Sequence, residues 1–471
     1  MSSDYIKRMF ERLKALAESS NEPALGNAVN DLEKAITVGN ITNSTGVAIG
    51  QNIRMVVNQL NLPAETAALL LDARGALGSV LGLDPARYSL ATLLADKARD
   101  FVGRAYVFKA IDDFMAERGS GYFVIEGDPG MGKSSILAEY VRRTGCIAHF
   151  NVRWSGITSA RHFLENICTQ LIVEFGLEYH SLPPEATQDG AFLMRLLQEA
   201  SSKLKVGERL VIAVDALDEV ELTGHPQGAN ILFLPPTLPD KVYFILTRRD
   251  VRVQLISQAP QDVLDLMIHP AENRDDVESY IRLNVERPKL REWIARQQGM
   301  TAGEFVGQLA ELSENNFMYL RYVLPEIEGG AYKNLDIKNL PSGLKGYYED
   351  HWLRMGMQAK PLPREKIRII YVMCEARQPV PRKLISQFAT NEEMPVDELT
   401  VQEVLDEWSQ FLREQLGPDS ILYSIYHTSF RDFLHRKDIV QAAGVTIQGI
   451  NALIADYLWD QLFGKEERPP A

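Results

Sequence analysis

One eight-residue segment, running from Gly127 to Ser134, restricts the fold of this 471-residue chain more than any other feature. Its sequence, Gly-Asp-Pro-Gly-Met-Gly-Lys-Ser, fits the pattern G-x-x-x-x-G-K-[ST]. An apolar run at 122–126 predicts a buried strand before it, and residues 135–141 are typical of a helix behind it. In that order the pieces form a phosphate-binding loop, because glycines let backbone N–H groups turn toward phosphate oxygens and the helix N-terminus adds its dipole. The segment predicts a nucleoside triphosphate site, with ATP and Mg²⁺ as the expected ligands.

The side chains of this loop have separate predicted tasks. Lys133 would reach the β- and γ-phosphates, and the hydroxyl of Ser134 would bind Mg²⁺. The predicted nucleotide contacts of the segment are Asp128, Pro129, Gly130, Met131, Gly132, Lys133, Ser134 and Ser135. The alternative is a glycine-rich turn without a ligand, but the fixed positions match by chance only on the order of 0.02 times in a chain of this length.

Acidic residues follow a second predicted strand, Leu210 to Val214. Asp215 is the candidate ligand on the metal side, and either Asp218 or Glu219 could polarise a water at the γ-phosphate. The alternative for Asp218 and Glu219 is that they cap the next helix. Predicted catalytic residues are Asp218, Glu219, Lys133 and Arg249.

Arginines follow another predicted strand, in the sequence Thr247-Arg248-Arg249. Ligands of open α/β sheets lie at the carboxyl edge of the strands, so one of these arginines could sense the γ-phosphate. We expect Arg249 to do so; the alternative is an exposed loop arginine.

A tripeptide before the first helix of this region, Val102-Gly103-Arg104, could fold across adenine. A linker turn explains the tripeptide equally well without further information.

The rest of the chain divides by its periodicity. Buried strands are expected at 122–126, 147–152, 210–214, 242–246 and 263–268, with helices between them, which predicts a parallel α/β sheet. Amphipathic helices punctuated by Pro288, Pro325 and Pro341 fill 274–345, and a possible hairpin around 415–425 among helices indicates a winged helix. The predicted regions are a mainly helical module with an Asn/Gly-rich break (1–98), a P-loop NTPase of the ASCE type (99–270), a helical domain (271–345), a winged helix (346–440) and the start of a further helical segment (441–471).

Composition narrows the possible partners and the compartment. The formal net charge of -13 argues against general electrostatic attraction to nucleic acid or to an anionic membrane. Three cysteines without a CxxC pair argue for a reducing compartment, best the cytoplasm, and against zinc. The sequence contains no apolar run of transmembrane length and no signal peptide, so we expect no membrane span.

Together these motifs resemble the STAND class of signalling NTPases, the NACHT and NB-ARC relatives of immune receptors and bacterial defence proteins. The resemblance covers about residues 100–440. Such proteins carry an hhGR motif, a P-loop, a strand ending D-[GA]-L-D-E and a strand ending T-[SR]-R; this chain has Val102-Gly103-Arg104, Gly127 to Ser134, Asp215 to Glu219 and Thr247 to Arg249. The stretches 316–324 and 340–347 also look like those of prokaryotic and fungal NACHT-type proteins. The resemblance makes Val102, Gly103 and Arg104 predicted nucleotide contacts.

A histidine near the C-terminus completes the resemblance. Residues 426–434 are similar to the winged-helix signature whose histidine contacts the β-phosphate of ADP in the resting state, which implies this role for His427. Because Ser429-Phe-Arg-Asp has the form of a capping box, we expect a helix to begin there, with His427 just outside it. A histidine that is only structural is the alternative.

The resemblance implies a nucleotide-operated switch. ADP would hold the closed form, ATP would release it to form homo-oligomers that activate an N-terminal signalling or defence effector, and slow ATP hydrolysis would reset it. Val47 to Gly50 superficially resembles short amyloid signalling motifs; the alternative is a polar loop or hairpin. A C-terminal sensor would be truncated or replaced by a partner protein, and the stimulus stays open.

Two other functions stay open at this point. One is a nucleic-acid-remodelling ATPase of the AAA+ type, whose winged helix would bind DNA through the modest basic cluster Arg364, Lys366, Arg368, Arg382 and Lys383. The other is a scaffold that binds nucleotide only for stability and does not hydrolyse it.

Overall fold

The structure is a computed structural model that describes most of the chain from residue 90 onward. The described residues are 90–152, 157–179, 182–221, 226, 228–250, 255–297, 299–332, 336–376, 378–390, 395–416, 420–436 and 446–463, with Lys14, Gly26, Asn27, Val29 and Asn30. The predicted break and amyloid-like segment around Val47 lie outside the described residues. Two compact units are found: the first comprises Met1–Val152 and Ile157–Tyr280, and the second continues from Ile281.

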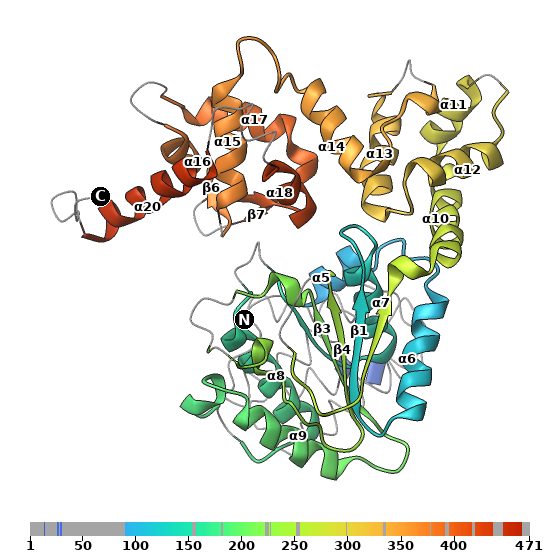
Figure 1. Cartoon of the computed structure of the whole chain (residues 1–471), viewed down its shortest axis with the longest axis vertical. Helices are drawn as coiled ribbons and strands as arrows, with labels where there is room; N and C mark the ends of the chain where they lie inside the picture. The colour runs from blue at the N-terminus through green and yellow to red at the C-terminus, as the bar shows by residue number, and fades with distance from the viewer. Residues whose placement is uncertain are drawn as a thin grey trace. The chain divides into compact units, whose positions relative to one another are not determined.

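The first unit is built on a five-stranded parallel sheet with strand order β2-β3-β4-β1-β5 (Figure 1). The inner strands are continuous apolar runs buried on both faces, as expected for a sheet covered by helices. The strands are β1 (Gly121–Glu126), β2 (Ile147–Phe150), β3 (Leu210–Asp215), β4 (Val242–Arg248) and β5 (Gln261–Asp265). The predicted parallel sheet is confirmed.

The last strand was predicted too far along the chain. Its residues pair with β1 from Gln261 to Asp265, and Leu266–Ile268 forms a 3-10 turn instead of continuing the strand. The Asp265 side chain explains the change, because it accepts a hydrogen bond from the Met267 N–H at 2.8 Å and so caps the turn.

Helices pack against this sheet through apolar faces. α7 contacts β3 and β4, α8 contacts β2, and α6 contacts β5. In α6 the buried side chains Val107, Ile111, Phe114 and Met115 follow helical spacing. The helices are α5 (Leu90–Lys97), α6 (Ala105–Glu117), α7 (Lys133–Thr144), α8 (Ala160–Phe175) and α9 (Ala191–Lys203).

Helices also fill the region in which we expected them after the sheet. α10 (Pro270–Val285) leads from the first unit into the second and is followed by α11 (Pro288–Arg296), α12 (Ala302–Leu312), α13 (Phe317–Gly329) and α14 (Gly343–Arg354). Pro288 begins a helix, but Pro325 lies inside α13 and does not interrupt it as the sequence suggested. Six buried side chains and the Asn316 cap, which accepts from two backbone N–H groups, outweigh the hydrogen bond that the proline removes.

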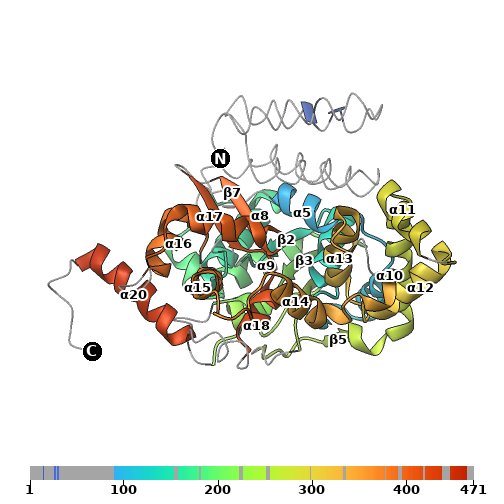
Figure 2. The same cartoon turned by 90° about the horizontal axis from the view of Figure 1, so that it is seen from above.

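The remaining part of the second unit combines short helices with a small sheet. The predicted hairpin is present as β7 (Leu412–Leu416) and β8 (Ile421–Ile425), and β6 (Val380–Pro381) extends it to the order β6-β8-β7. α15 (Arg364–Glu375), α16 (Arg382–Ala389), α17 (Glu398–Glu407) and α18 (Thr428–Leu434) surround it, and α20 (Ile447–Phe463) packs on α15 and α16 (Figures 1 and 2).

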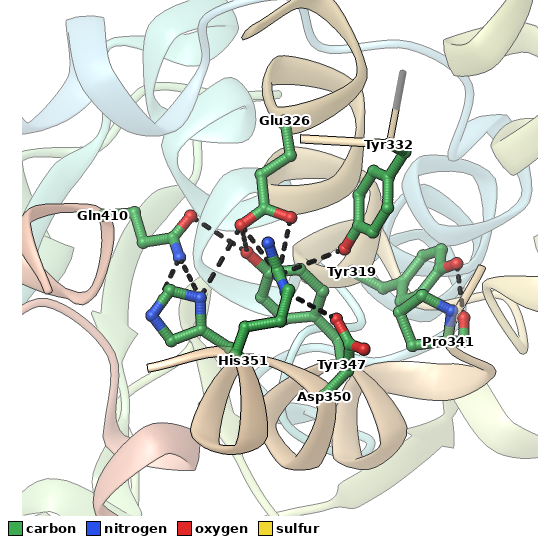
Figure 3. Close-up of polar contacts among 9 residues, drawn as sticks. Tyr319, Glu326, Tyr332, Pro341, Tyr347, Asp350, His351 and Gln410 are labelled. Atoms are coloured by element: carbon green, nitrogen blue, oxygen red, sulfur yellow. Dashed lines mark hydrogen bonds and ion pairs between the residues drawn. The ribbon is translucent and has the colours of Figure 1, made fainter. Parts of the chain in front are cut away.

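A polar cluster around Glu326 ties α13 to α14 (Figure 3). The Glu326 carboxylate accepts from the Tyr347 hydroxyl at 2.8 Å and from the Arg354 guanidinium at 2.8 Å. The Tyr347 hydroxyl oxygen is also 2.9 Å from the Gln410 side chain, which lies just before β7 and is itself 2.8 Å from His351. This cluster therefore connects the helical region with the segment that leads into the hairpin.

Candidate functional site

The phosphate loop has the backbone that its sequence predicts. It joins β1 to α7, and Gly130 and Gly132 adopt φ values of +87° and +86°, in the left-handed region that favours glycine. The Lys133 ammonium donates to the carbonyls of Gly127 at 2.6 Å and Asp128 at 3.0 Å, and so folds back over the loop. Burial lowers the pKa of Lys133, and the charge of Asp218 partly opposes this effect.

Asp215 ends β3 as a buried carboxylate. The Thr247 hydroxyl, at the end of neighbouring β4, donates to it and accepts from the Ala216 N–H at 2.8 Å. Burial raises the pKa of Asp215, while hydrogen bonds from Thr247 and Ser134 oppose the shift. Ser134 of the loop and Asp215 are thus hydrogen-bonded to each other, and their binding of one metal ion stays a prediction.

Asp218 and Arg249 form a pair. Asp218 lies in the 3-10 turn Leu217–Glu219, and its carboxylate accepts from the Arg249 backbone N–H at 3.1 Å and from the Arg249 side chain at 2.9 Å. Both oxygens of Asp218 are therefore engaged. Glu219, in the same turn, is half-buried, and the described residues 220 and 221 that follow it are not helical.

The neighbouring arginine has a separate partner. Arg248 pairs with Glu126 across the carboxyl ends of β4 and β1, which are parallel neighbours in register. Each side chain is only 15% exposed. This pair fixes the end of the strand that leads into the phosphate loop.

The segment before α6 reaches the loop from outside. The guanidinium of Arg104 donates to the Met131 carbonyl at 2.7 Å and to the side chain of Asn273 on α10. Gly103 and Val102 lie beside it, half-buried or exposed. The described bonds of Arg104 go to protein atoms, and its contact with a nucleotide stays a prediction.

His427 lies in the second unit, just outside α18 as expected, and it caps the first turn of that helix. Its Nδ1 accepts from the Ser429 backbone N–H at 3.2 Å, so His427 itself is the N-cap, and the predicted start at Ser429 is wrong by one residue. The reason is that Ser429 is buried, with its hydroxyl 2.8 Å from the Tyr348 hydroxyl. Phe430, Phe433 and Leu434 are buried as predicted. Because a backbone N–H can only donate, Nδ1 is unprotonated and the ring proton is on Nε2.

Two asparagines of the site, Asn151 and Asn273, were not predicted from the sequence. Asn151 follows β2 and donates to the Asp215 carbonyl at 2.7 Å, and Asn273 accepts from both Arg104 and Tyr106. A polar residue directly after a strand was a usable signal for Asn151. No sequence signal marked Asn273, because it is one polar residue among many acidic and basic residues of the same helix.

One group of metal-ligating side chains is present in the described residues, at Cys374, Glu375 and His435. The sequence did not predict this group, because α15 and the end of α18 are far apart in the chain. The His435 Nε2 lies 2.6 Å from one Glu375 oxygen, and Asn451 donates to the other at 2.9 Å, so protein partners account for both oxygens.

Among the described helices, none combines the length and the apolar character that a membrane span requires.

The similarity of this chain to known proteins is low. No protein-family model matches the chain, and none of the curated proteins matches it significantly. The solved structure of a Walker-type ATPase from Pyrococcus abyssi aligns with 71% of this chain and 95% of its own, at 12% sequence identity and a TM-score of 0.31. The order of the sheet, with a glycine-rich loop between β1 and α7, is the stronger observation, and it shows that the chain contains an α/β P-loop NTPase fold.

Proposed function

We propose that the chain is an ATP/ADP-operated switch of the STAND class. The observation that carries the proposal is the convergence of Lys133, Ser134, Asp215 and the Asp218–Arg249 pair at the carboxyl ends of β1, β3 and β4. The position of β4 between β1 and β3 supports the ASCE type of sheet. Each of these groups has a role in binding a nucleoside triphosphate or in distinguishing ATP from ADP.

Mg²⁺ fits the oxygen donors that the site offers. Ser134 and Asp215 would hold it, since hydroxyl and carboxylate oxygens are ligands that Mg²⁺ prefers. Asp215 is buried and its pKa is raised mainly by burial, so a cation beside it would relieve the cost of keeping the carboxylate ionised. The ion would neutralise charge on the β- and γ-phosphates.

The Asp218–Arg249 pair supports different roles for the carboxylates of Asp218 and Glu219. Asp218 holds Arg249 through both oxygens, so we assign the water-polarising role to Glu219 in preference to Asp218. In this scheme the γ-phosphate competes with Asp218 for the Arg249 guanidinium, which distinguishes ATP from ADP. Slow hydrolysis then resets the switch.

The closed form of the proposed switch uses His427 as the second contact with ADP. Its capping geometry leaves the proton on Nε2, the form in which the ring can donate to a phosphate oxygen while Nδ1 still caps α18. Release on exchange for ATP, homo-oligomerisation and activation of an N-terminal effector follow from the resemblance to STAND proteins, as do a sensor or partner protein and a cytoplasmic location.

The hydrogen-bond and ion-pair partners of the basic cluster weigh against the DNA-remodelling alternative. Lys366 pairs with Glu407 at 2.7 Å, Arg382 pairs with Glu398 at 3.4 Å, and Arg368 donates to the Ala389 carbonyl. The carboxylate partners of Lys366 and Arg382 reduce the attraction of these two cations for DNA phosphates.

The switch is tested by asking whether ADP stabilises the second unit. Four of the five tryptophans, Trp293, Trp352, Trp408 and Trp459, follow residue 281, so tryptophan fluorescence reports the unfolding of that unit. ADP at about 100 times its Kd stabilises whatever it holds by about 2.7 kcal/mol. We expect ADP to raise the tryptophan-detected Tm of the wild type.

Two His427 variants separate capping from nucleotide contact. His427→Asn replaces the ring nitrogen by an amide oxygen that can cap the helix, so we expect normal stability without ADP but loss of the ADP-induced shift. His427→Ala should lose the shift and also about 1 kcal/mol of stability without ADP. If His427→Asn keeps the full shift, or if bound ADP never moves the tryptophan transition, the lock is wrong.

A further inference from the structure

Arg104 is held in an uncommon position for an arginine. It is 2% exposed and has a φ of +61°, while Gly103 before it has a φ of +73°. A Cβ at position 103 would clash with the Asp276 carboxylate, and the left-handed backbone there favours glycine. This backbone lets the Arg104 N–H donate to Asp276 at 3.1 Å. A non-glycine residue in the left-handed region is strained, and the surrounding contacts must offset that strain.

The guanidinium joins two structural elements. One terminal nitrogen donates to the Met131 carbonyl at 2.7 Å, and the other donates to Asn273 and to the Tyr106 hydroxyl at 3.0 Å. Asn273 is itself fixed, since its amide donates to the Leu266 carbonyl and its oxygen also accepts from Tyr106 at 2.9 Å. The fork geometry of arginine allows these bonds at once.

The bond to Met131 has a stereochemical consequence for the phosphate loop. The Met131 carbonyl and the Gly132 N–H belong to the same planar trans peptide, so they point in opposite directions. A cation that holds the carbonyl on one side therefore directs the Gly132 N–H to the other side and polarises it. Gly132, with a φ of +86°, would otherwise allow this peptide to rotate.

We propose that Arg104 is a positioning residue that presents the Gly132 N–H to the nucleotide phosphates without touching the nucleotide itself. This inference rests on the proposed nucleotide-binding function. Asn273 and Asp276 belong to α10, which continues from the first unit into the second. A displacement of the first turns of α10 would release Arg104 and weaken phosphate binding, so the same residue links phosphate affinity to the helix that leaves the domain.

The experiment measures binding of ADP, and of inorganic pyrophosphate in competition with it, to full-length Arg104→Met. Pyrophosphate carries phosphates but no base or sugar. We expect both affinities to fall by about tenfold, which corresponds to about 1.4 kcal/mol. Arg104→Lys should show a smaller loss in both, because one ammonium keeps the charge but cannot serve all the acceptors.

The matched control is Arg142→Met. Arg142 is a 13% exposed arginine that pairs with Glu139 and lies in the last turn of α7, at the end opposite the loop. It should lose thermal stability without losing ADP or pyrophosphate affinity. If Arg104→Met does not fold, the comparison of Arg104→Lys with the control decides.

Three results would have different meanings. Wild-type affinities in a folded Arg104→Met overturn the inference. A loss for ADP with unchanged pyrophosphate also overturns it, because it would indicate a direct contact with the base or sugar. Failure of the wild type and of Arg142→Met to bind ADP at all would instead contradict the proposed function.

Discussion

At the scale of single residues, the carboxyl edge of the sheet depends on one hydroxyl. Thr247 is fully buried, and it connects β3 to β4 by donating to Asp215 and accepting from the Ala216 N–H. Valine has nearly the same shape and no hydroxyl. Replacing Thr247 by valine would leave the half-buried Ala216 N–H and the buried Asp215 carboxylate each without one partner.

We therefore expect Thr247→Val to lower the free energy of unfolding by about 1–3 kcal/mol and Thr247→Ser to lower it much less. Urea unfolding of both variants, followed by circular dichroism, measures this difference. Equal stability of the valine variant and the wild type would show that the hydroxyl contributes nothing to holding Asp215.

The residue types of the site could be predicted from the sequence, but their pairings could not. Lysine, serine and carboxylates at fixed spacing indicated phosphate and metal chemistry. The Arg104–Met131 and Asp218–Arg249 bonds join residues 27 and 31 positions apart, and the choice of partner depends on how strands and turns place them. Asp218 therefore could not be recognised in advance as the residue that holds Arg249.

At the scale of helices and strands, the Glu326 cluster makes the packing of α13 on α14 sensitive to acid. Burial raises the pKa of Glu326, but hydrogen bonds from His351, Tyr332 and Tyr347 and the charge of Arg354 outweigh burial and lower the pKa to about 2. Because the folded pKa is below the unfolded value, this stabilisation is complete above about pH 4.5 and is lost as pH falls toward 2.

Glu326→Gln should remove this dependence. A shift of this size corresponds to about 3 kcal/mol, so we expect the variant to be less stable than the wild type at pH 7 by up to that amount and nearly equal to it near pH 2. Urea unfolding at a series of pH values, detected by tryptophan fluorescence, measures the difference. Glu328→Gln, on the same helix and paired with Arg287 at 3.6 Å, is the control. Parallel curves for Glu326→Gln and the wild type would contradict the assignment.

Element types were predictable where the pattern was long, and their ends were not. The βα alternation gave the parallel sheet, but Asp265 ended β5 early, His427 displaced Ser429 as the cap of α18, and α13 continued through Pro325. In each case a side chain or the packing of a buried face decided a boundary that local propensity left open.

At the scale of the whole molecule, the central claim is that the first unit binds ATP and ADP through its phosphate loop. Calorimetric titration of nucleotide-free protein with each nucleotide and Mg²⁺ tests it most directly. Lys133→Ala is compared with Lys109→Ala, whose lysine is 74% exposed and pairs with Asp113 on α6. We expect the wild type and Lys109→Ala to bind with a Kd of about 1 μM or tighter, and Lys133→Ala to bind at least about 100-fold more weakly. Absence of binding by the wild type, or undiminished binding by Lys133→Ala, would contradict the claim.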